Sequence, residues 1–565
     1  MLNADPAQRP YRVRRCDPMR AAELGRAWGV GSAAAQVMLL RGVQESDAAD
    51  YLDPRLQRMT SPEGMADRDK AAERLAEACR RGETVSIFGD YDVDGTTSAA
   101  ILADMLEHLG AKVHAFVANR FQGGYGFSSP ALQRCLAVKP DLIVTCDCGS
   151  SDHGRIRDAK AAGVEVIVVD HHLVPAEPLP AFAFLNPHRP DCGFPYKGLC
   201  SAGLALSIGA AVRTKLGAKL DIRQWLDLVA LGTVADVAPL DGDNRRLVRA
   251  GLRLLTSPHA RPGVQALREK AWLKPGMPIG ANEIAFRLAP RLNAAGRLGD
   301  PTVTLQLLRA RTLEEARHHA ATIENLNGER KDISRQTTEE AYEQVEARYG
   351  KQPNHGVVVA SKSWHRGVVG ITAARIVDRY DVPAVVIAVD EYGHGSGRTP
   401  EGIDLYAAMK ACEEQFLRFG GHQAAAGVTI DPANIDAFAE RFAQASPRLE
   451  AGQSPPLADV EIGGTIKMPS LEDLMRLEPL GEGNEQPVFA LKDARVLEAR
   501  DLSDGQHLKL RLQVGQSVVS AFGPNMGHRV EELGERITAL GTLRPDLFRG
   551  HGTLELSLQH VFANH

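Results

Sequence analysis

Short apolar runs of β-favouring residues alternate with helix-compatible segments from about residue 84 onward. The clearest strand candidates lie at 85–88, 113–117, 142–146 and 164–169. Segments with helical spacing lie between them, at 98–109, 130–138 and 153–162. Two more helical segments follow at 202–215 and 221–231. This alternation predicts an α/β domain with a parallel sheet covered by helices.

The pattern changes again toward the C-terminus. Residues 304–347 contain no Pro and one Gly, which predicts a long polar helix or, as an open alternative, two helices broken at Gly328. A second alternating region has strand candidates at 357–360, 385–389 and 427–430. From about residue 455, candidates at 488–491, 508–514, 517–522, 536–542 and 553–558 are separated by turn residues. The last set predicts a small antiparallel barrel or sandwich.

These changes divide the chain into five parts. Periodic stretches at 20–40 and 48–52 make the first part a helical brace. The predicted boundaries are 1–60 for the brace, 61–302 for the first α/β domain, 303–348 for the connecting helix, 349–452 for the second α/β domain and 453–565 for the all-β domain.

Composition limits the functions that the chain can have. Hydrophobic residues make up 44% and charged residues 24% of the 565 residues, as in an ordinary globular protein. The net charge of -5 excludes a global positive field, so a nucleic-acid site must be a local basic groove. Eight cysteines without repeated spacing favour a reducing cytoplasm over a disulfide framework. No apolar run is long enough to span a bilayer, and the first residues lack a secretory signal, so we expect no membrane association.

Three carboxylates form the first candidate site. Asp90, Asp92 and Asp94 occur in GDYDVDG, directly after the strand candidate 85–88. A calcium-binding EF-hand loop also starts this way, but its twelfth position must be Glu and is Ile101 here. A solvated acidic turn would be the default interpretation of this motif alone.

Other polar groups follow neighbouring strand candidates. Asp147 follows 142–146, and Asp170, His171 and His172 follow 164–169. Because ligands bind at the carboxyl edge of open α/β sheets, these groups should converge there, with Asp236 as a further carboxylate. Aspartates with one or two histidines favour Mn²⁺ or Mg²⁺, and the donors suffice for two ions. Two such ions imply hydrolysis of a phosphodiester or pyrophosphate.

Cys146 and Cys148 flank Asp147 and invite a zinc assignment. Strand alternation predicts that both point away from Asp147. We therefore interpret them as small packing residues.

Four motifs in order, GDYDVDGTTSAA, DCGSSDH, VVDHH and LGTVADV, resemble those of the DHH phosphoesterase superfamily. The first motif is similar to the RecJ branch, and so are RLNAAGRLG, SWHRGVVGITAARI, GSGRT and GGHQAAAG downstream. The resemblance implies a parallel-sheet DHH catalytic domain, a long connecting helix, a DHH-associated α/β domain and an oligonucleotide-binding (OB) fold. It also implies a single-stranded-DNA-specific 5′ to 3′ exonuclease of DNA recombination and repair.

The resemblance assigns roles to the catalytic residues. It makes Asp90, Asp92, Asp94, Asp147, His171 and Asp236 metal ligands. His172 corresponds to the position that touches the scissile phosphate. We expect Asp170 to orient a metal-ligand histidine, because metal-bound imidazoles usually need a hydrogen-bond acceptor behind them.

Further residues are expected to bind DNA. By resemblance, Arg120, Ser396 and Arg398 bind the 5′ phosphate, assisted by backbone N–H groups of GSGR. Arg291, Asn293 and Arg297 are candidate backbone clamps, and Gly420, Gly421 and His422 a further DNA contact. In the last domain six residues could line a single-strand groove, of which half should be ordinary barrel residues: Phe489, His507, Lys509, Arg511, Phe522 and Arg529.

Two alternatives remain open at this stage. One is a DHH-family phosphodiesterase of short oligonucleotides or cyclic dinucleotides, and the other is a DNA-binding replication scaffold without catalysis. The C-terminal β domain argues against the first, and the complete set of aspartates argues against the second. The resemblance further implies a cytoplasmic monomer that works with single-stranded DNA, a single-strand-binding protein and a DNA helicase.

Overall fold

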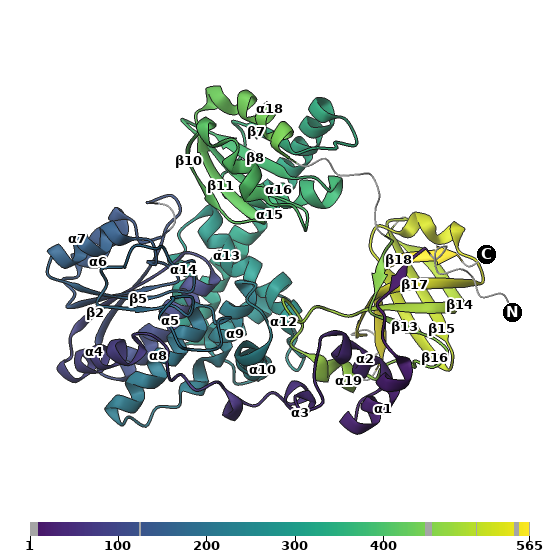
Figure 1. Cartoon of the computed structure of the whole chain (residues 1–565), viewed down its shortest axis with the longest axis horizontal. Helices are drawn as coiled ribbons and strands as arrows, with labels where there is room; N and C mark the ends of the chain where they lie inside the picture. The colour runs from purple at the N-terminus through teal and green to yellow at the C-terminus, as the bar shows by residue number, and fades with distance from the viewer. Residues whose placement is uncertain (1–9, 124–125, 447–454, 504, 547–552, 564–565) are drawn as a thin grey trace.

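The structure is a computed structural model that describes residues 10–123, 126–446, 455–503, 505–546 and 553–563. Three bodies are visible in Figure 1: a large α/β domain, a smaller α/β domain connected to it through a long helix, and a β-barrel at the opposite side. Among the described residues, no helix is both long and apolar enough to cross a lipid bilayer.

The first sheet is parallel throughout, as predicted. Its strand order is β3-β2-β4-β5-β6. The bounds are β2 Thr84–Gly89, β3 Lys112–Val117, β4 Leu142–Cys146, β5 Glu165–Val169 and β6 Ala183–Leu185. The four predicted strands are confirmed, whereas the three-residue β6 lacked a recognisable pattern.

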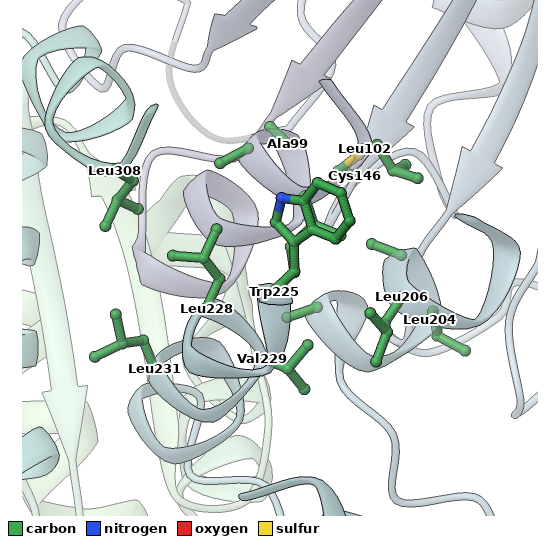
Figure 2. Close-up of a cluster of buried hydrophobic side chains, with 14 of the residues drawn as sticks. Ala99, Leu102, Cys146, Leu204, Leu206, Trp225, Leu228, Val229, Leu231 and Leu308 are labelled. Atoms are coloured by element: carbon green, nitrogen blue, oxygen red, sulfur yellow. The ribbon is translucent and has the colours of Figure 1, made fainter. Parts of the chain in front are cut away.

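Helices cover both faces of this sheet. One face carries α4 (Arg68–Arg81), α5 (Val93–His108), α8 (Ser201–Leu216) and α9 (Leu226–Ala235). The other face carries α6 (Ser129–Ala137) and α7 (His153–Ala161). Figure 2 shows the first core around the buried Trp225. Because both faces are buried, the strands are continuous apolar runs.

A helical layer completes the first domain. It contains α10 (Gly242–Thr256), α11 (Pro262–Lys270) and α14 (Thr302–Arg309). Between α11 and α14, the run α12 (Ala281–Glu283), a π-turn (Ile284–Leu288) and α13 (Ala289–Leu298) forms one continuous helix. Short 3-10 turns lie at 56–58, 222–225, 413–415, 432–434 and 527–532.

The predicted helix over 304–347 is divided, but not at Gly328. The chain leaves α14 at Ala310 and starts α15 (Leu313–Tyr349) after Thr312, whose side chain caps the Glu315 N–H. Gly328 lies inside this 37-residue helix. The alternative of a break at Gly328 is therefore wrong.

The second domain is less parallel than expected. Its sheet order is β10-β11-β9-β8-β7, and only β7 and β8 are parallel. The strands are β7 Val357–Ser361, β8 Ala384–Val389, β9 Gly393–Arg398, β10 Phe416–Gly421 and β11 Ala425–Ile430. The helices are α16 Val369–Tyr380, α17 Leu405–Lys410 and α18 Ile435–Ala445. One βαβ unit is thus extended by antiparallel strands.

The C-terminal domain is a closed barrel, as predicted. Strands follow the order β13-β14-β15-β16-β18-β17, and a β14–β17 pairing closes the ring. The bounds are β13 Val460–Ile462, β14 Val488–Leu502, β15 His507–Val514, β16 Ser517–Gly523, β17 Arg536–Pro545 and β18 Leu554–Ala563, with α19 at Leu471–Leu477.

The N-terminal helices belong to the barrel rather than to the first domain. The short strand β1 (Arg12–Val13) pairs in parallel with β12 (Leu457–Ala458). Helices α1 (Pro18–Trp28), α2 (Ser32–Leu40) and α3 (Ala48–Leu52) follow it. Val37 and Met38 of α2 and Leu52 of α3 share one apolar core with barrel residues.

Candidate metal centre and nucleic-acid interface

The acidic loop connects β2 to α5 at the carboxyl edge of the first sheet. Asp90 directly follows β2, and its N–H donates to Cys146 O at 3.1 Å. Asp92 caps α5 by accepting the Gly95 N–H at 3.0 Å. Because α5 starts at Val93, five residues before the predicted start, Asp94 lies in its first turn. A Cβ on Gly95 would lie 2.5 Å from Asp90 N, so the loop requires glycine there.

The N-terminus of α8 holds Asp94 in place. The Asp94 carboxylate accepts the Ser201 N–H at 2.7 Å and the Ala202 N–H at 2.9 Å. Ser201 Oγ also donates to Asp147 Oδ1 at 3.1 Å. Negative charge is stabilised at this end of a helix. Ser201 was not recognised as a site residue from the sequence. Its only signal is its position just before the predicted helix 202–215, which follows the proline-rich residues 175–190.

Asp147 is the centre of the cluster. It follows β4 with a φ of 63°, and its Oδ1 lies 3.2 Å from His171 Nε2. The same His171 nitrogen lies 3.6 Å from Asp236 and 3.9 Å from Asp94. The structure therefore brings together the groups that follow β2, β4 and β5, with Asp236 from the end of α9.

These side chains form overlapping donor sets suited to cations. One set is Asp90, Asp92 and Asp147, and a second is Asp94, His171 and Asp236, with donor atoms within 4.8 Å of one another. Asp147 and His171 also form a third set with His172. Asp90 Oδ1 and His171 Nε2 are buried without a hydrogen-bond partner among the described residues. Because the donors are mainly oxygen with one imidazole, they fit two Mn²⁺ or Mg²⁺ ions.

The electrostatics of the site also favour bound cations. Burial raises the pKa of Asp90 and Asp147, and Asp92 raises both further. Burial and the Asp94 charge raise the pKa of Asp236 to about 8. No Lys or Arg forms an ion pair with these carboxylates in the described part of the chain. Positive ions would relieve this crowding of negative charge.

Asp170 holds the ring of His172 rather than that of the expected metal ligand His171, to which it is linked only through the backbone N–H. Its Oδ1 lies 2.7 Å from His172 Nδ1, and its Oδ2 accepts the Ser150 N–H at 3.0 Å. Burial opposes charge on His172, but the hydrogen bond to Asp170 outweighs it and raises the pKa of His172 to about 9. The same pair keeps the pKa of Asp170 below its usual range although burial acts to raise it. The pair suits contact with a phosphate.

The two cysteines are packing residues, but not for the predicted geometric reason. Cys146 and Cys148 are both buried, and burial raises the pKa of each thiol. Cys146 belongs to the core with α5 and α8, whereas Cys148 belongs to the core with α6 and α7. The positive φ of Asp147 ends the strand alternation, so the two side chains face opposite sides of the sheet.

An arginine cluster adjoins the metal centre. The Arg120 guanidinium lies 4.7 Å from the centre of the Tyr91 ring and donates to its hydroxyl at 3.1 Å. Burial, together with the charges of neighbouring arginines that include Arg120 and Arg398, lowers the pKa of Arg297 to about 10. None of these three arginines forms an ion pair within the described residues. Buried positive charge without a carboxylate partner is suited to an anion.

Two domains contribute to this cluster. Arg297 Nη1 donates to Gly367 O at 3.1 Å, and Arg366 Nη2 donates to Arg120 O at 3.4 Å. Arg398 Nη1 donates to Ser396 Oγ at 3.0 Å. Ser396 and Arg398 lie beside Gly370, where a Cβ would meet Ser396 Oγ at 3.0 Å. The start of α16 therefore faces both side chains.

The backbone of GSGR does not bind the 5′ phosphate as expected. Residues 395–398 are part of β9, which pairs with β8 on one side and β11 on the other. The N–H groups of this central strand belong to the sheet, so only the Ser396 and Arg398 side chains remain as anion donors.

Arg291 is also not a DNA clamp in this structure. It is buried, with Nε 2.6 Å from Glu324 Oε2 and further donations to Arg287 O and Lys270 O. Its contacts join α13 to α15. Asn293 is partly exposed on α13, and its role in DNA binding stays a prediction.

The glycine-rich hairpin is exposed. Gly420, Gly421 and His422 lie at the turn between β10 and β11, and all three are solvent-accessible. Gly421 has a φ of 156°, and a Cβ there would meet Ala425 O at 2.4 Å. Their DNA contact stays a prediction, and only Gly421 has a structural need for glycine.

The six candidate residues of the barrel groove differ in their surroundings, and their contact with DNA stays a prediction. Phe489 is fully buried, Arg529 pairs with Glu532, and Lys509 with Glu555. Lys509 also lies 5.9 Å from the centre of the Phe522 ring, which contacts His507 edge-on at 5.5 Å. A small cationic and aromatic face therefore remains around Phe522, with the exposed Arg511 on the same strand as Lys509.

Family models match three segments of the chain. The DHH family N-terminal domain matches residues 84–233, the DHHA1 domain 354–446 and the RecJ OB domain 462–560. The matches cover the parallel-sheet domain, the second α/β domain and the barrel.

Similar proteins and structures extend over most of the chain. The single-stranded-DNA-specific exonuclease RecJ of Escherichia coli (strain K12) is 33% identical over 92% of this chain and 94% of its own length. The protein of the same name from Dickeya dadantii (strain 3937) is 34% identical over 87% of this chain and 90% of its own length. The crystal structure of Thermus thermophilus RecJ with Mn²⁺ has a TM-score of 0.81 at 31% identity, covering 98% of this chain and 79% of that one. A crystal structure with Mg²⁺ from the same organism has a TM-score of 0.76 at 29% identity, covering 98% of this chain and 78% of that one.

Proposed function

Since this chain belongs to the RecJ family of single-stranded-DNA-specific exonucleases, we propose that it hydrolyses single-stranded DNA from the 5′ end with two divalent cations. The arginine cluster of Arg120, Arg297 and Arg398 carries this proposal. It adjoins the metal centre through Tyr91, whose neighbours in sequence are Asp90 and Asp92. An end phosphate held by the cluster would place the first phosphodiester near the carboxylates.

The chain's own groups define the chemistry. Asp90, Asp92, Asp94, Asp147, His171 and Asp236 would hold Mn²⁺ or Mg²⁺ ions, which activate water and neutralise phosphate oxygens when bound. Asp147 belongs to two of the donor sets, so its carboxylate would contribute to holding both ions. Asp170 orients His172 through Nδ1, and the raised pKa favours an imidazolium that attracts the phosphate.

Recognition of a 5′ phosphate favours cleavage of one particular bond, the P–O3′ bond. If water attacks phosphorus and the P–O3′ bond breaks, a 5′ mononucleotide with a 3′ hydroxyl leaves. The remaining strand then carries a new 5′ phosphate. Each cut would regenerate the group that Arg120, Ser396 and Arg398 bind, so the strand could advance one nucleotide at a time. This register is the reason to propose 5′ polarity.

The alternatives have less support. A hydrolase of short oligonucleotides or cyclic dinucleotides has no use for a barrel that matches the RecJ OB domain. A scaffold without catalysis has no use for the three overlapping sets of metal donors.

The family resemblance extends the proposal beyond the chemistry. We include a cytoplasmic, monomeric enzyme of recombination and repair that works with a single-strand-binding protein and a DNA helicase. Sedimentation of the purified protein, alone and mixed with each partner, would test these points. The division near residues 60, 302, 348 and 452 is part of the proposal, with the N-terminal brace assigned to the barrel.

An end-labelling experiment tests the activity and its polarity. Single-stranded and duplex DNA, labelled at the 5′ or 3′ end, would be incubated with the protein and Mn²⁺ or Mg²⁺. We expect early release of a labelled mononucleotide only from the 5′ end of single strands. Early release from the 3′ end, or equal degradation of duplex DNA, would contradict the proposal.

Arg398→Ala tests recognition of the end phosphate. A terminal phosphate carries more charge than an internal diester, so the arginine should contribute more there, about 1.5 to 3 kcal/mol. We expect roughly ten- to hundredfold lower kcat/KM on 5′-phosphorylated strands and little change on 5′-hydroxyl strands.

Arg335→Ala is a matched control, because Arg335 is exposed on α15 and pairs only with Asp332 among the described residues. It should leave both rates unchanged. Equal slowing of both substrates by Arg398→Ala would make Arg398 a general backbone contact or a structural residue.

A further inference from the structure

The helix that carries Arg297 has one stripe of accessible residues. From residue 281 to 298, this face includes the exposed Asn282 and Phe286 and the half-buried Pro290, Asn293 and Arg297. The spacing is four, four, three and four residues, which places all five on one side of a helix. The opposite side is buried through Ile284, Leu288 and Leu292 in the core of the first domain.

Phe286 lies in the π-turn of this helix. Pro290 has no N–H with which to bond the Phe286 carbonyl, as a regular helix would require. The helix instead contains a wider turn, in which the Ala289 N–H donates to Ile284 O. The Phe286 ring points outward and is 77% exposed.

A second exposed aromatic residue belongs to the segment that the π-turn contacts. Arg287 donates to the carbonyl of Ala271, which joins the π-turn to the end of α11. The next residue, Trp272, is 81% exposed and has a φ of 57°. Left-handed backbone and high exposure are both unfavourable for tryptophan. The Trp272 N–H donates to Glu269 O at 3.2 Å, but among the described residues the indole ring has no hydrogen bond, ring contact or cation–π contact.

The surroundings of the two rings are basic. Lys274 is exposed, and Lys270 and Arg287 are partly exposed. Two acidic side chains lie nearby. Glu269 forms an ion pair with Arg317, and Glu283 accepts a hydrogen bond from the Gly280 N–H. Net positive charge around exposed aromatic rings is the composition of a single-strand binding surface.

The stripe is continuous with the catalytic interface. Arg297, at its other end, belongs to the arginine cluster beside the metal centre. Phe286 lies eleven residues earlier, about 16 Å away along the helix axis. In Figure 1, α12 lies on the side of the first domain that faces the barrel, and α13 lies below the second domain. A strand running from the metal centre toward the barrel could follow this helix.

We propose that Phe286 and Trp272 form a stacking platform for bases of single-stranded DNA, several nucleotides from the end being cleaved. The proposal rests on the proposed function, because it needs a DNA strand in the catalytic domain. Aromatic rings accept any base, so the platform would add affinity without sequence preference. It would act only on strands long enough to reach it.

Steady-state kinetics of the full-length protein test this dependence on length. The substrates are a 5′-phosphorylated dinucleotide and a strand of about 20 nucleotides. Phe286→Ala should raise KM for the long strand roughly five- to hundredfold with kcat unchanged. Both parameters should stay unchanged on the dinucleotide, which cannot span the distance from Arg297 to Phe286. Trp272→Ala should act in the same direction.

Three further variants separate stacking from other effects. Phe286→Trp should keep KM for the long strand within about twofold, whereas Phe286→Leu should resemble Phe286→Ala, because leucine keeps the apolar surface but lacks the π-face. Tyr392→Ala is the control, since Tyr392 is an exposed aromatic residue in the second domain. It should change neither substrate.

Three results would contradict either the stacking platform or the proposed function. An unchanged KM for the long strand in Phe286→Ala and Trp272→Ala would overturn the platform and leave an acidic protein segment as the occupant of this basic surface. Equal changes on both lengths would make Phe286 a structural residue and would also overturn it. Failure of the wild-type protein to degrade either substrate would instead contradict the proposed function.

Discussion

At the scale of single residues, the backbone conformation of Asp147 decides what the site can do. A positive φ turns its carboxylate toward His171 and the acidic loop, instead of into either hydrophobic core. Aspartate and asparagine adopt this conformation more readily than most residues. The residue at this position must therefore combine a negative charge with tolerance of a left-handed backbone.

Asp147→Asn should abolish hydrolysis while DNA binding survives. Asparagine keeps the shape and tolerates the φ of 63°, but it cannot supply a bridging charge for two cations. We expect kcat to fall on the order of a thousandfold or more, equivalent to roughly 4 kcal/mol. The measurement is turnover over a titration of Mn²⁺, with strand affinity measured in parallel.

Asp141→Asn is the matched control, because Asp141 lies at the opposite end of β4, where it accepts the Thr84 N–H. Its turnover should remain close to that of the wild type. Normal turnover of Asp147→Asn at saturating Mn²⁺ would remove Asp147 from the metal centre.

At the scale of elements, the long helix α15 connects the two α/β domains. It contacts α11 and α13 of the first domain near its start and α16 and β7 of the second domain near its end. Gly328 lies in its interior, and a Cβ there would meet no atom within 4 Å. This glycine increases the entropy of the unfolded chain without serving a close contact.

Gly328→Ala should stabilise the protein. An alanine in an open helix interior is favoured over glycine by about 0.5 to 1 kcal/mol. We expect a rise in the thermal unfolding midpoint of about 2 °C, measured by calorimetry. Gly251→Ala in α10 should do the opposite, because its Cβ would lie 2.1 Å from Leu226 O. A lower midpoint for Gly328→Ala would show that the helix needs flexibility there.

Elements with a simple pattern could be predicted from the sequence. The buried strands β2, β4 and β5 are continuous apolar runs, and their ends located Asp90, Asp147 and Asp170. β14 could not be predicted in full, since its second half is charged and register shifts interrupt its pairing. β9 is GHGSGR, a composition typical of loops. Its strand depends on partners that local sequence does not specify.

The functional site, too, could be predicted only in part from local sequence. Motifs identified the metal donors, but the contacts between Ser201 and Asp94, Arg297 and Gly367, and Glu324 and Arg291 join segments far apart in sequence. Arg291 is an example: it was expected to clamp DNA, but it forms an ion pair inside the protein.

At the scale of the whole molecule, the N-terminal helices and the barrel form one unit attached to the first domain. Arg245 of α10 helps to join them, because its guanidinium donates to the carbonyls of Tyr51, Leu477 and Pro479. The ring of Tyr51 also lies 4.0 Å from this guanidinium. The barrel is therefore held to the catalytic domain by the chain that precedes that domain as well as by the chain that follows it.

Truncation should reveal this arrangement. A fragment of residues 1–454 keeps the N-terminal helices but exposes the apolar faces of Val37, Met38 and Leu52. We expect it to aggregate. A fragment of residues 61–446 should fold and cleave short oligonucleotides, while binding long strands at least about tenfold more weakly than the full chain.

Solubility, circular dichroism and strand affinity at one salt concentration are the measurements. Equal solubility of the two fragments would contradict the common core of the N-terminal helices and the barrel. Undiminished affinity of the fragment 61–446 for long strands would remove the barrel from DNA binding.

The pairing of β1 with β12 has a consequence for biosynthesis. Arg12 leaves the ribosome long before its partner Leu457 is made. At about 5 to 20 residues per second, the intervening chain takes roughly 20 to 90 s to translate. During this time α1 to α3 have no barrel to cover them, so this segment is synthesised before the barrel but can complete its packing only after it. We expect the nascent chain to expose an apolar surface that chaperones can bind until the barrel emerges.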